Sequence, residues 1–135
     1  MYLCTVVSYS CCAEFSLRSG GKYLQPGKVE MLGSSQFPVA FNIPKSNYYF
    51  LVGKAGYRIV IEFLYIDLPD GQQDCHRNYV AVRDGFRSGP MLAHLCGPSD
   101  RVQYSTNGMV MRVNMASAPT QNTRGFLAKA WIEQA

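Results

Sequence analysis

Apolar and polar residues alternate with a period of two along several short stretches of the chain, which is the pattern of half-buried β-strands. The clearest example is GYRIVIEFLYIDL, in which Ile59, Ile61 and Phe63 share one face while Arg58 and Glu62 point to the other. A polar loop with turn residues, PDGQQD, follows this stretch. The pattern predicts a strand over residues 57–68.

Weaker stretches of the same kind recur along the rest of the chain. They cover residues 47–53, 78–85, 90–97, 108–115 and 123–133. One or two more strands are expected between residues 18 and 38, where Gly, Pro and Ser interrupt the chain. The last stretch is expected to be an edge strand. Short strands at this spacing, with no convincing helix between them, predict an all-β protein with an antiparallel sandwich or barrel.

Length and composition agree with one ordered domain. The chain has 135 residues, of which 47% are hydrophobic and 16% charged. The net charge of +4 comes from scattered Lys and Arg, so nucleic-acid binding is not expected. Charged residues interrupt the most hydrophobic segment, so we expect no membrane insertion by this domain.

Residues 1–18 read as an N-terminal extension ahead of a domain that covers residues 19–135. The extension is either the remnant of a secretory signal or a domain-boundary segment. It holds Cys4, Cys11 and Cys12, three of the five cysteines. Adjacent cysteines rarely bond to each other, so at least one thiol is expected to be available for a disulfide-linked dimer.

Catalysis is not expected. The chain lacks the nucleophile-elbow, zinc-protease and phosphate-loop motifs. Cys75 stands beside His76, but adjacent side chains on a strand point to opposite faces, so this histidine is poorly placed as a base. We predict a protein that is not an enzyme and needs no cofactor.

Two alternatives remain for Cys75 and Cys96. Together with His76 and His94 they offer two sulfurs and two nitrogens, which is a plausible zinc set. Paired zinc ligands usually have two to four residues between them on a tight turn, whereas Cys75 and His76 are adjacent and His94 and Cys96 have one residue between them. A disulfide between the two cysteines is the favoured alternative.

Six motifs follow one another in an order typical of one family. They are S-G-G at 19–21, S-S-Q-F-P at 34–38, an apolar run from Gly56 to Leu68, C-x-x-x-x-V-x-V-x-D-G at 75–85, L-x-x-L-C-G at 92–97 and G-F-x-A at 125–128. With them, the chain from Ser19 to Trp131 resembles a CUB domain. CUB domains are extracellular jelly-roll β-sandwiches found in complement proteases, tolloid-like proteinases, neuropilins and spermadhesins.

The resemblance implies a disulfide between Cys75 and Cys96 and hence an oxidising compartment. The protein is therefore expected to be secreted or to lie on the extracellular side of a membrane. Its expected function is protein recognition within a larger secreted or membrane-attached protein. The alternatives are a stand-alone, spermadhesin-like protein that binds glycans or heparin, and an accessory domain of an extracellular protease.

The sequence departs from the family pattern at two places. The first disulfide of a typical member is absent, because its positions hold Ser19 and Tyr48. Many members bind calcium through three acidic residues, and the corresponding positions hold Pro69, Asn78 and Ala116. Calcium requires several oxygen ligands, most of them charged. We therefore predict no metal site and calcium-independent binding.

Loops on a rigid sandwich are the usual place for binding. The residues predicted to contact a ligand are polar or aromatic and lie along one loop edge: Tyr65, Asp67, Asp70, Arg77, Asn78 and Arg87.

Overall fold

The computed structural model describes residues 20–68, 75–96, 101–118 and 122–135. These ranges form nine strands and no helix. The strands are β1 (Gly20–Tyr23), β2 (Glu30–Gly33), β3 (Lys45–Val52), β4 (Tyr57–Asp67), β5 (Tyr79–Asp84), β6 (Met91–Leu95), β7 (Gln103–Ser105), β8 (Val110–Ser117) and β9 (Gly125–Gln134). A helix long and apolar enough to cross a membrane does not occur in the described part of the chain.

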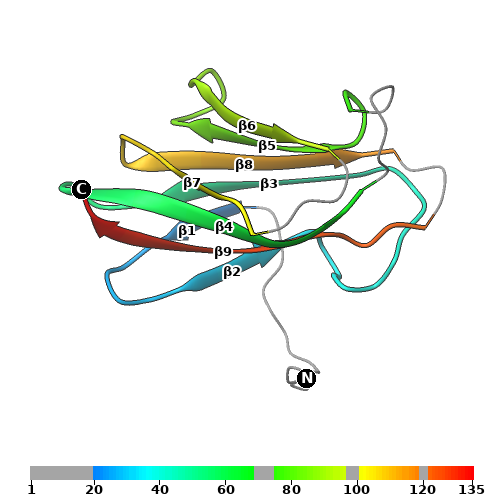
Figure 1. Cartoon of the computed structure of the whole chain (residues 1–135), viewed down its shortest axis with the longest axis horizontal. Coiled ribbons are helices and arrows are strands. Elements are labelled where there is room, and N and C mark those ends of the chain that lie inside the picture. The colour runs from blue at the N-terminus through cyan, green and yellow to red at the C-terminus, as the bar shows by residue number, and fades with distance from the viewer. Residues whose placement is uncertain (1–19, 69–74, 97–100, 119–121) are drawn as a thin grey trace.

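The strands form two layers, as Figure 1 shows. One sheet has five strands in the order β1-β3-β8-β5-β6, and the other has four in the order β2-β9-β4-β7. Neighbouring strands are antiparallel except for β1 and β3, which are parallel. The predicted antiparallel β-sandwich is confirmed.

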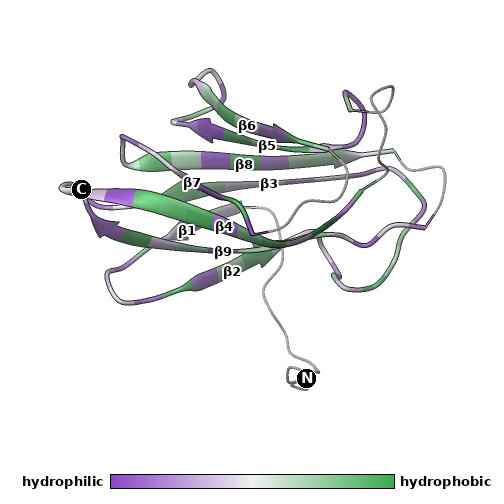
Figure 2. Ribbon diagram, in the orientation of Figure 1, coloured by the Kyte–Doolittle hydropathy of each residue, from purple (hydrophilic) through white to green (hydrophobic). Residues whose placement is uncertain are grey.

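The core lies between the two layers and is filled mainly by alternate residues of the longer strands. Ile59, Ile61 and Phe63 of β4 are fully buried, as predicted, and Met111 and Val113 of β8 meet them from the other sheet's side of the core. Figure 2 shows the alternation along β8 as successive hydrophobic and hydrophilic bands. Burial of these apolar side chains is the main source of the domain's stability.

The structure differs from the sequence prediction at three strands. β9 is not an edge strand, because it pairs with β2 on one side and β4 on the other. β7 was not predicted, since its three residues are too few to show an alternation. Met109 lies in the stretch predicted as a strand over residues 108–115, but it precedes β8 and is 46% exposed.

The Cys75–Cys96 disulfide is confirmed, with the two Cα atoms 5.3 Å apart. Both sulfurs are therefore unavailable to zinc, and the zinc alternative is wrong. His94 serves this region differently: its Nε2 lies 3.0 Å from the carbonyl oxygen of Cys75, and its ring stacks on Tyr79 at a centroid distance of 4.6 Å. The disulfide joins the start of β5 to the end of β6.

Candidate functional site

One end of the sandwich carries four of the six predicted binding residues. β4 ends there at Asp67 and β5 begins there at Tyr79, close to Arg77 and Asn78. The connections from β2 to β3 and from β8 to β9 cross between the sheets at the same end (Figure 1). We call this region the loop end. Asp70, another predicted residue, lies outside the described residues.

Arg87 lies at the opposite end of the sandwich. It belongs to the turn between β5 and β6, which follows the pairing of Asp84 with Met111 at the far end of β8. The sequence suggested one loop edge because the two turns are close along the chain. The intervening strand β5 separates them by its full length.

The polar atoms of Asp67 hold the loop end in shape. Its Oδ2 accepts a hydrogen bond from the backbone N–H of Arg124 at 2.9 Å. Its backbone oxygen accepts a hydrogen bond from Thr123 Oγ1. Tyr65, two residues earlier, is 37% exposed and packs edge-on against Phe37 at a centroid distance of 5.4 Å. Tyr65 therefore offers a partly exposed aromatic surface at the loop end.

Asn78 is only 1% exposed. Its Oδ1 accepts hydrogen bonds from Ser117 Oγ at 2.9 Å and from the backbone N–H of Ala118 at 2.8 Å. The preceding residue, Arg77, is exposed. Asn78 therefore fixes the shape of the loop end from inside, whereas Arg77 lies at the surface.

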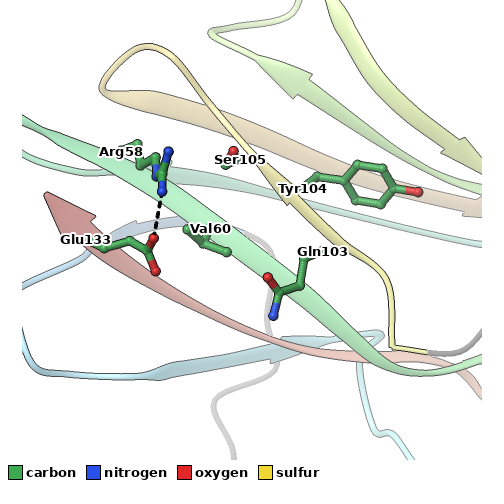
Figure 3. Close-up of a pocket in the computed structure, with 6 residues that line it drawn as sticks. All are labelled: Arg58, Val60, Gln103, Tyr104, Ser105 and Glu133. Atoms are coloured by element: carbon green, nitrogen blue, oxygen red, sulfur yellow. Dashed lines mark hydrogen bonds and ion pairs between the residues drawn. The ribbon is translucent and has the colours of Figure 1, made fainter. Parts of the chain in front are cut away.

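The outer face of the four-stranded sheet has a small hollow of about 200 Å³ (Figure 3). Its charged residues are Arg58 on β4 and Glu133 on β9, whose Nη2 and Oε1 atoms lie 3.0 Å apart. Hydrogen bonds from Trp131 and Arg58 lower the pKa of the Glu133 carboxyl. Arg58 and Glu133 neutralise each other, so this hollow offers a ligand little unpaired charge.

A second carboxylate on that face is also paired. Glu62 accepts hydrogen bonds from Gln103 Nε2 at 3.2 Å and from Arg101 Nη1 at 3.0 Å. These bonds, together with the charge of Lys129, lower the pKa of the Glu62 carboxyl despite the burial of its side chain. Charge on the outer face of the four-stranded sheet is thus balanced locally.

The outer face of the five-stranded sheet is different, because no described carboxylate forms an ion pair with the arginines Arg83, Arg87 and Arg112. A hollow of about 370 Å³ opens there over β5, β6 and β8. Its lining is His76, Tyr79, Ala81, Arg83, Arg87, Met91, His94, Arg112 and Asn114. We call the surface made by Arg83, Arg87, Arg112, His76 and His94 the basic face. None of the described residues that line it is acidic.

Of the residues of this basic face, the sequence predicted only Arg87 as a ligand contact, and it named His76 and His94 only as possible zinc ligands. The alternation of Val80 and Val82 does imply that Arg83 points outward, and the neighbours of Arg112 imply the same. The juxtaposition of the two arginines also depends on the pairing of β5 with β8, which the alternation does not specify.

Metal ligation finds no support in the described ranges, where no three His, Cys, Asp or Glu side chains gather closely enough to hold an ion.

Comparison with known proteins gives a consistent result. The family model of the CUB domain matches residues 21–129. Human cubilin is 32% identical over 79 residues, and dog cubilin is 30% identical over 79 residues. Each match covers 58% of this chain and 2% of the relative. The chain thus spans about one-fiftieth of the length of these relatives.

Solved structures agree at the level of the fold. The extracellular region of zebrafish Gpr126/Adgrg6 aligns with a TM-score of 0.70 and 22% identity, over 87% of this chain and 15% of that one. The CUB1-EGF-CUB2 domains of rat MASP-1 align with a TM-score of 0.71 and 17% identity, over 85% of this chain and 43% of that one. The MASP-1 CUB2 domain bound to Ca²⁺ aligns with a TM-score of 0.67 and 15% identity, over 81% of this chain and 96% of that one.

The matched family model covers most of the described strands, and the two-sheet architecture and disulfide agree with the motif order in the sequence. The chain belongs to the CUB domain family, whose members are extracellular protein-interaction modules of larger proteins.

Proposed function

We propose that this domain is a non-catalytic module that binds another protein, as part of a larger protein that is secreted or exposed outside the cell. The observation that carries the proposal is the loop end, where internal hydrogen bonds hold a surface with Tyr65 and Arg77 exposed. A rigid sandwich that presents fixed loops is suited to recognition, because little ordering entropy is lost on binding. Cys75 is bound in a disulfide and is not a nucleophile.

Binding by this domain is proposed to be independent of calcium. The positions at which many family members supply acids hold Pro69, Asn78 and Ala116. The one amide oxygen among them already accepts two hydrogen bonds, from Ser117 and Ala118. Calcium coordination needs several oxygen ligands, and this set supplies too few.

A disulfide-linked dimer through Cys4, Cys11 or Cys12 is a further proposal, and these residues lie outside the described ranges. Electrophoresis of the protein without and with reductant tests it. A dimer band that disappears on reduction supports the proposal, and a monomer under both conditions contradicts it.

The proposed function can be tested on a panel of extracellular proteins. The purified chain is applied to the panel in calcium chloride and again in EGTA, and binding is quantified by surface plasmon resonance. We expect at least one protein to bind equally well in both buffers. Removing the exposed contacts with Tyr65→Ala or Arg77→Gln should weaken binding about tenfold, which corresponds to about 1.4 kcal/mol.

The matched control is Tyr23→Ala, which removes an aromatic side chain that is 76% exposed on β1. Failure of every protein on the panel to bind would contradict the proposed function. Sulfated glycans are the second candidate ligand, because of the basic face. A heparin oligosaccharide is therefore included in the panel.

A further inference from the structure

Two arginines stand directly opposite each other on the outer face of the five-stranded sheet. The register of β5 and β8 pairs Arg83 with Arg112. Like charges in this relationship are destabilising, and an acidic residue at one of the two positions would be favourable. The fold therefore retains an unfavourable charge pair at the centre of the basic face.

Neither guanidinium is neutralised by a carboxylate among the described residues. Arg83 Nη1 donates a hydrogen bond to the backbone oxygen of Gly89 at 2.9 Å. Arg112 Nε is buried and has no hydrogen-bond partner in the described part of the chain. The Arg112 guanidinium instead lies over the ring of Phe50, 5.8 Å from its centroid. A buried donor without an acceptor is costly. A carboxylate bound at the surface would instead accept charged hydrogen bonds from the guanidinium groups and relieve the repulsion between the two arginines.

The hollow beside these two arginines has room for an incoming side chain. Its volume is about 370 Å³, and Arg87 and His76 add further nitrogen atoms to its lining. A guanidinium presents a planar set of N–H groups that matches the two oxygens of a carboxylate. The chemistry of the hollow thus favours an anionic group.

Apolar side chains flank the arginines on both sides. The register places Phe50 of β3 opposite Arg112, and Met91 of β6 opposite Arg83. One row therefore crosses four strands in the order Phe50, Arg112, Arg83, Met91. With neighbouring strands about 4.8 Å apart, this row is about 14 Å long. It matches the length of a short peptide segment.

The apolar flanks extend beyond the row. Tyr48 packs against Phe50 at a centroid distance of 5.8 Å, and Phe86 packs against Phe50 at 5.7 Å. Tyr48 is 45% exposed, Phe86 61% and Met91 44%. Exposed aromatic residues and Met beside Arg are the composition of protein interfaces, whereas a sulfated glycan offers no apolar side chains to cover them. The surface is better suited to a protein than to a glycan.

We propose that the row from Phe50 to Met91 binds an acidic segment of a protein partner. Asp or Glu carboxylates of the segment contact Arg83 and Arg112, and apolar side chains beside them pack on Phe50 and Met91. The inference deepens the proposed function, since it assumes that the ligand is a protein. It concerns a surface separate from Tyr65 and Arg77.

A random peptide library displayed on phage tests this inference. The library is selected on the full chain and, in parallel, on the double variant Arg83→Gln/Arg112→Gln. Lys28→Gln/Arg124→Gln is the charge-matched control, because it removes two exposed cations elsewhere. Arg83→Lys/Arg112→Lys keeps the charges and removes the planar donor set. Circular dichroism verifies that each variant is folded.

We expect enrichment of peptides that combine Asp or Glu with aromatic or aliphatic residues. The enriched peptides should bind the chain and the control variant equally, and bind the glutamine variant at least about tenfold more weakly, as expected for lost charged hydrogen bonds. The lysine variant should show intermediate affinity.

Three results would overturn the inference. The first is a selection with no enrichment of acidic peptides, and the second is enriched peptides that the glutamine variant binds equally well. The third is a heparin oligosaccharide that binds the basic face more tightly than any selected peptide. The proposed function fails separately, when no extracellular protein binds the chain on the panel described above.

Discussion

Ser117 donates a hydrogen bond from its Oγ to Asn78 Oδ1 at 2.9 Å, and both residues are almost fully buried. The bond joins the start of β5 to the end of β8, although the two residues are 39 positions apart in the chain. The same amide oxygen accepts the backbone N–H of Ala118. One side chain therefore fastens two strand ends where many relatives in the family place a calcium-binding acid.

Replacing Asn78 by Ala should lower the free energy of unfolding by about 1–3 kcal/mol, because the buried hydroxyl of Ser117 and the half-buried N–H of Ala118 lose their acceptor. Asn122→Ala, at an exposed position, is the control and should change stability by less than about 0.5 kcal/mol. Urea denaturation followed by fluorescence measures both. Equal stability of the two variants would show that the Asn78 amide is dispensable.

Calcium should leave the thermal midpoint of the chain unchanged, since Pro69, Asn78 and Ala116 occupy the three positions at which many family members supply acids. The triple variant Pro69→Glu/Asn78→Asp/Ala116→Asp restores the family's acidic positions and serves as a positive control. Its midpoint should rise with calcium concentration, as for any ligand that binds only the folded state. Differential scanning fluorimetry in calcium chloride and in EGTA makes the comparison. A calcium response of the unmodified chain would contradict the proposal.

The sequence was sufficient to predict the strands in which buried and exposed residues alternate over several two-residue repeats. Ile59, Ile61 and Phe63 are fully buried as expected. The Cys75–Cys96 pairing followed from the resemblance to a family, because zinc remained an alternative from the residues alone. The local patterns thus predicted the main strands, and the resemblance to the family predicted the disulfide.

Positions across the sheets were harder to predict. β9 is an interior strand because it pairs with both β2 and β4. The alternation within its own ten residues does not indicate which strands lie beside it. Likewise, Arg83 and Arg112 oppose each other only through the register of β5 and β8. Tertiary pairing of this kind is not encoded in the period of one strand.

The disulfide should contribute about 3 kcal/mol, since it closes a loop between residues 21 positions apart. The double variant Cys75→Ser/Cys96→Ser should therefore unfold at a lower urea concentration than the unmodified chain. Reductant should bring the unmodified chain to about the midpoint of the double variant and leave the variant unchanged. A chain whose midpoint is unaffected by reductant would contradict this assignment of stability.

Tyr49 connects the two sheets through the core. Its hydroxyl donates to the backbone oxygen of Gly33 at 2.6 Å, and the backbone N–H of Gly33 approaches the same hydroxyl at 3.4 Å. Tyr49→Phe should cost about 1–3 kcal/mol, because buried groups of Gly33 lose their partner. Tyr23→Phe, at an exposed position, is the control. Equal stability of the two variants would contradict the prediction.

The same residue should affect stability in alkali. Burial raises the pKa of the Tyr49 hydroxyl above its ordinary value near 10. The unfolded chain therefore loses this proton at a lower pH than the folded chain does. As a result, the free energy of unfolding falls as pH rises above about 10, the pKa of an unburied tyrosine. Stability should fall less steeply in alkali for Tyr49→Phe than for the unmodified chain. Urea midpoints between pH 8 and pH 11 measure the slope, and identical slopes would exclude Tyr49 as a cause.

Gly125 begins β9 with a φ of +90°, and a Cβ atom added there would lie 2.0 Å from Ser34 Oγ. Ser34 cannot easily move, because its Oγ donates to the backbone oxygen of Arg124 and accepts from the backbone N–H of Phe126. Gly125→Ala therefore combines backbone strain with a steric clash at a buried hydrogen-bonded side chain.

Gly27→Ala separates these two causes. Gly27 has a φ of +80°, but an added Cβ would meet no atom within 4 Å. The backbone strain alone should cost about 1–2 kcal/mol. The clash should make Gly125→Ala worse by about 1–3 kcal/mol, which is typical of overpacking a core. Urea denaturation of both variants measures the difference. Equal losses would mean that Ser34 moves aside without cost, and that the junction of β2 and β9 is looser than its hydrogen bonds indicate.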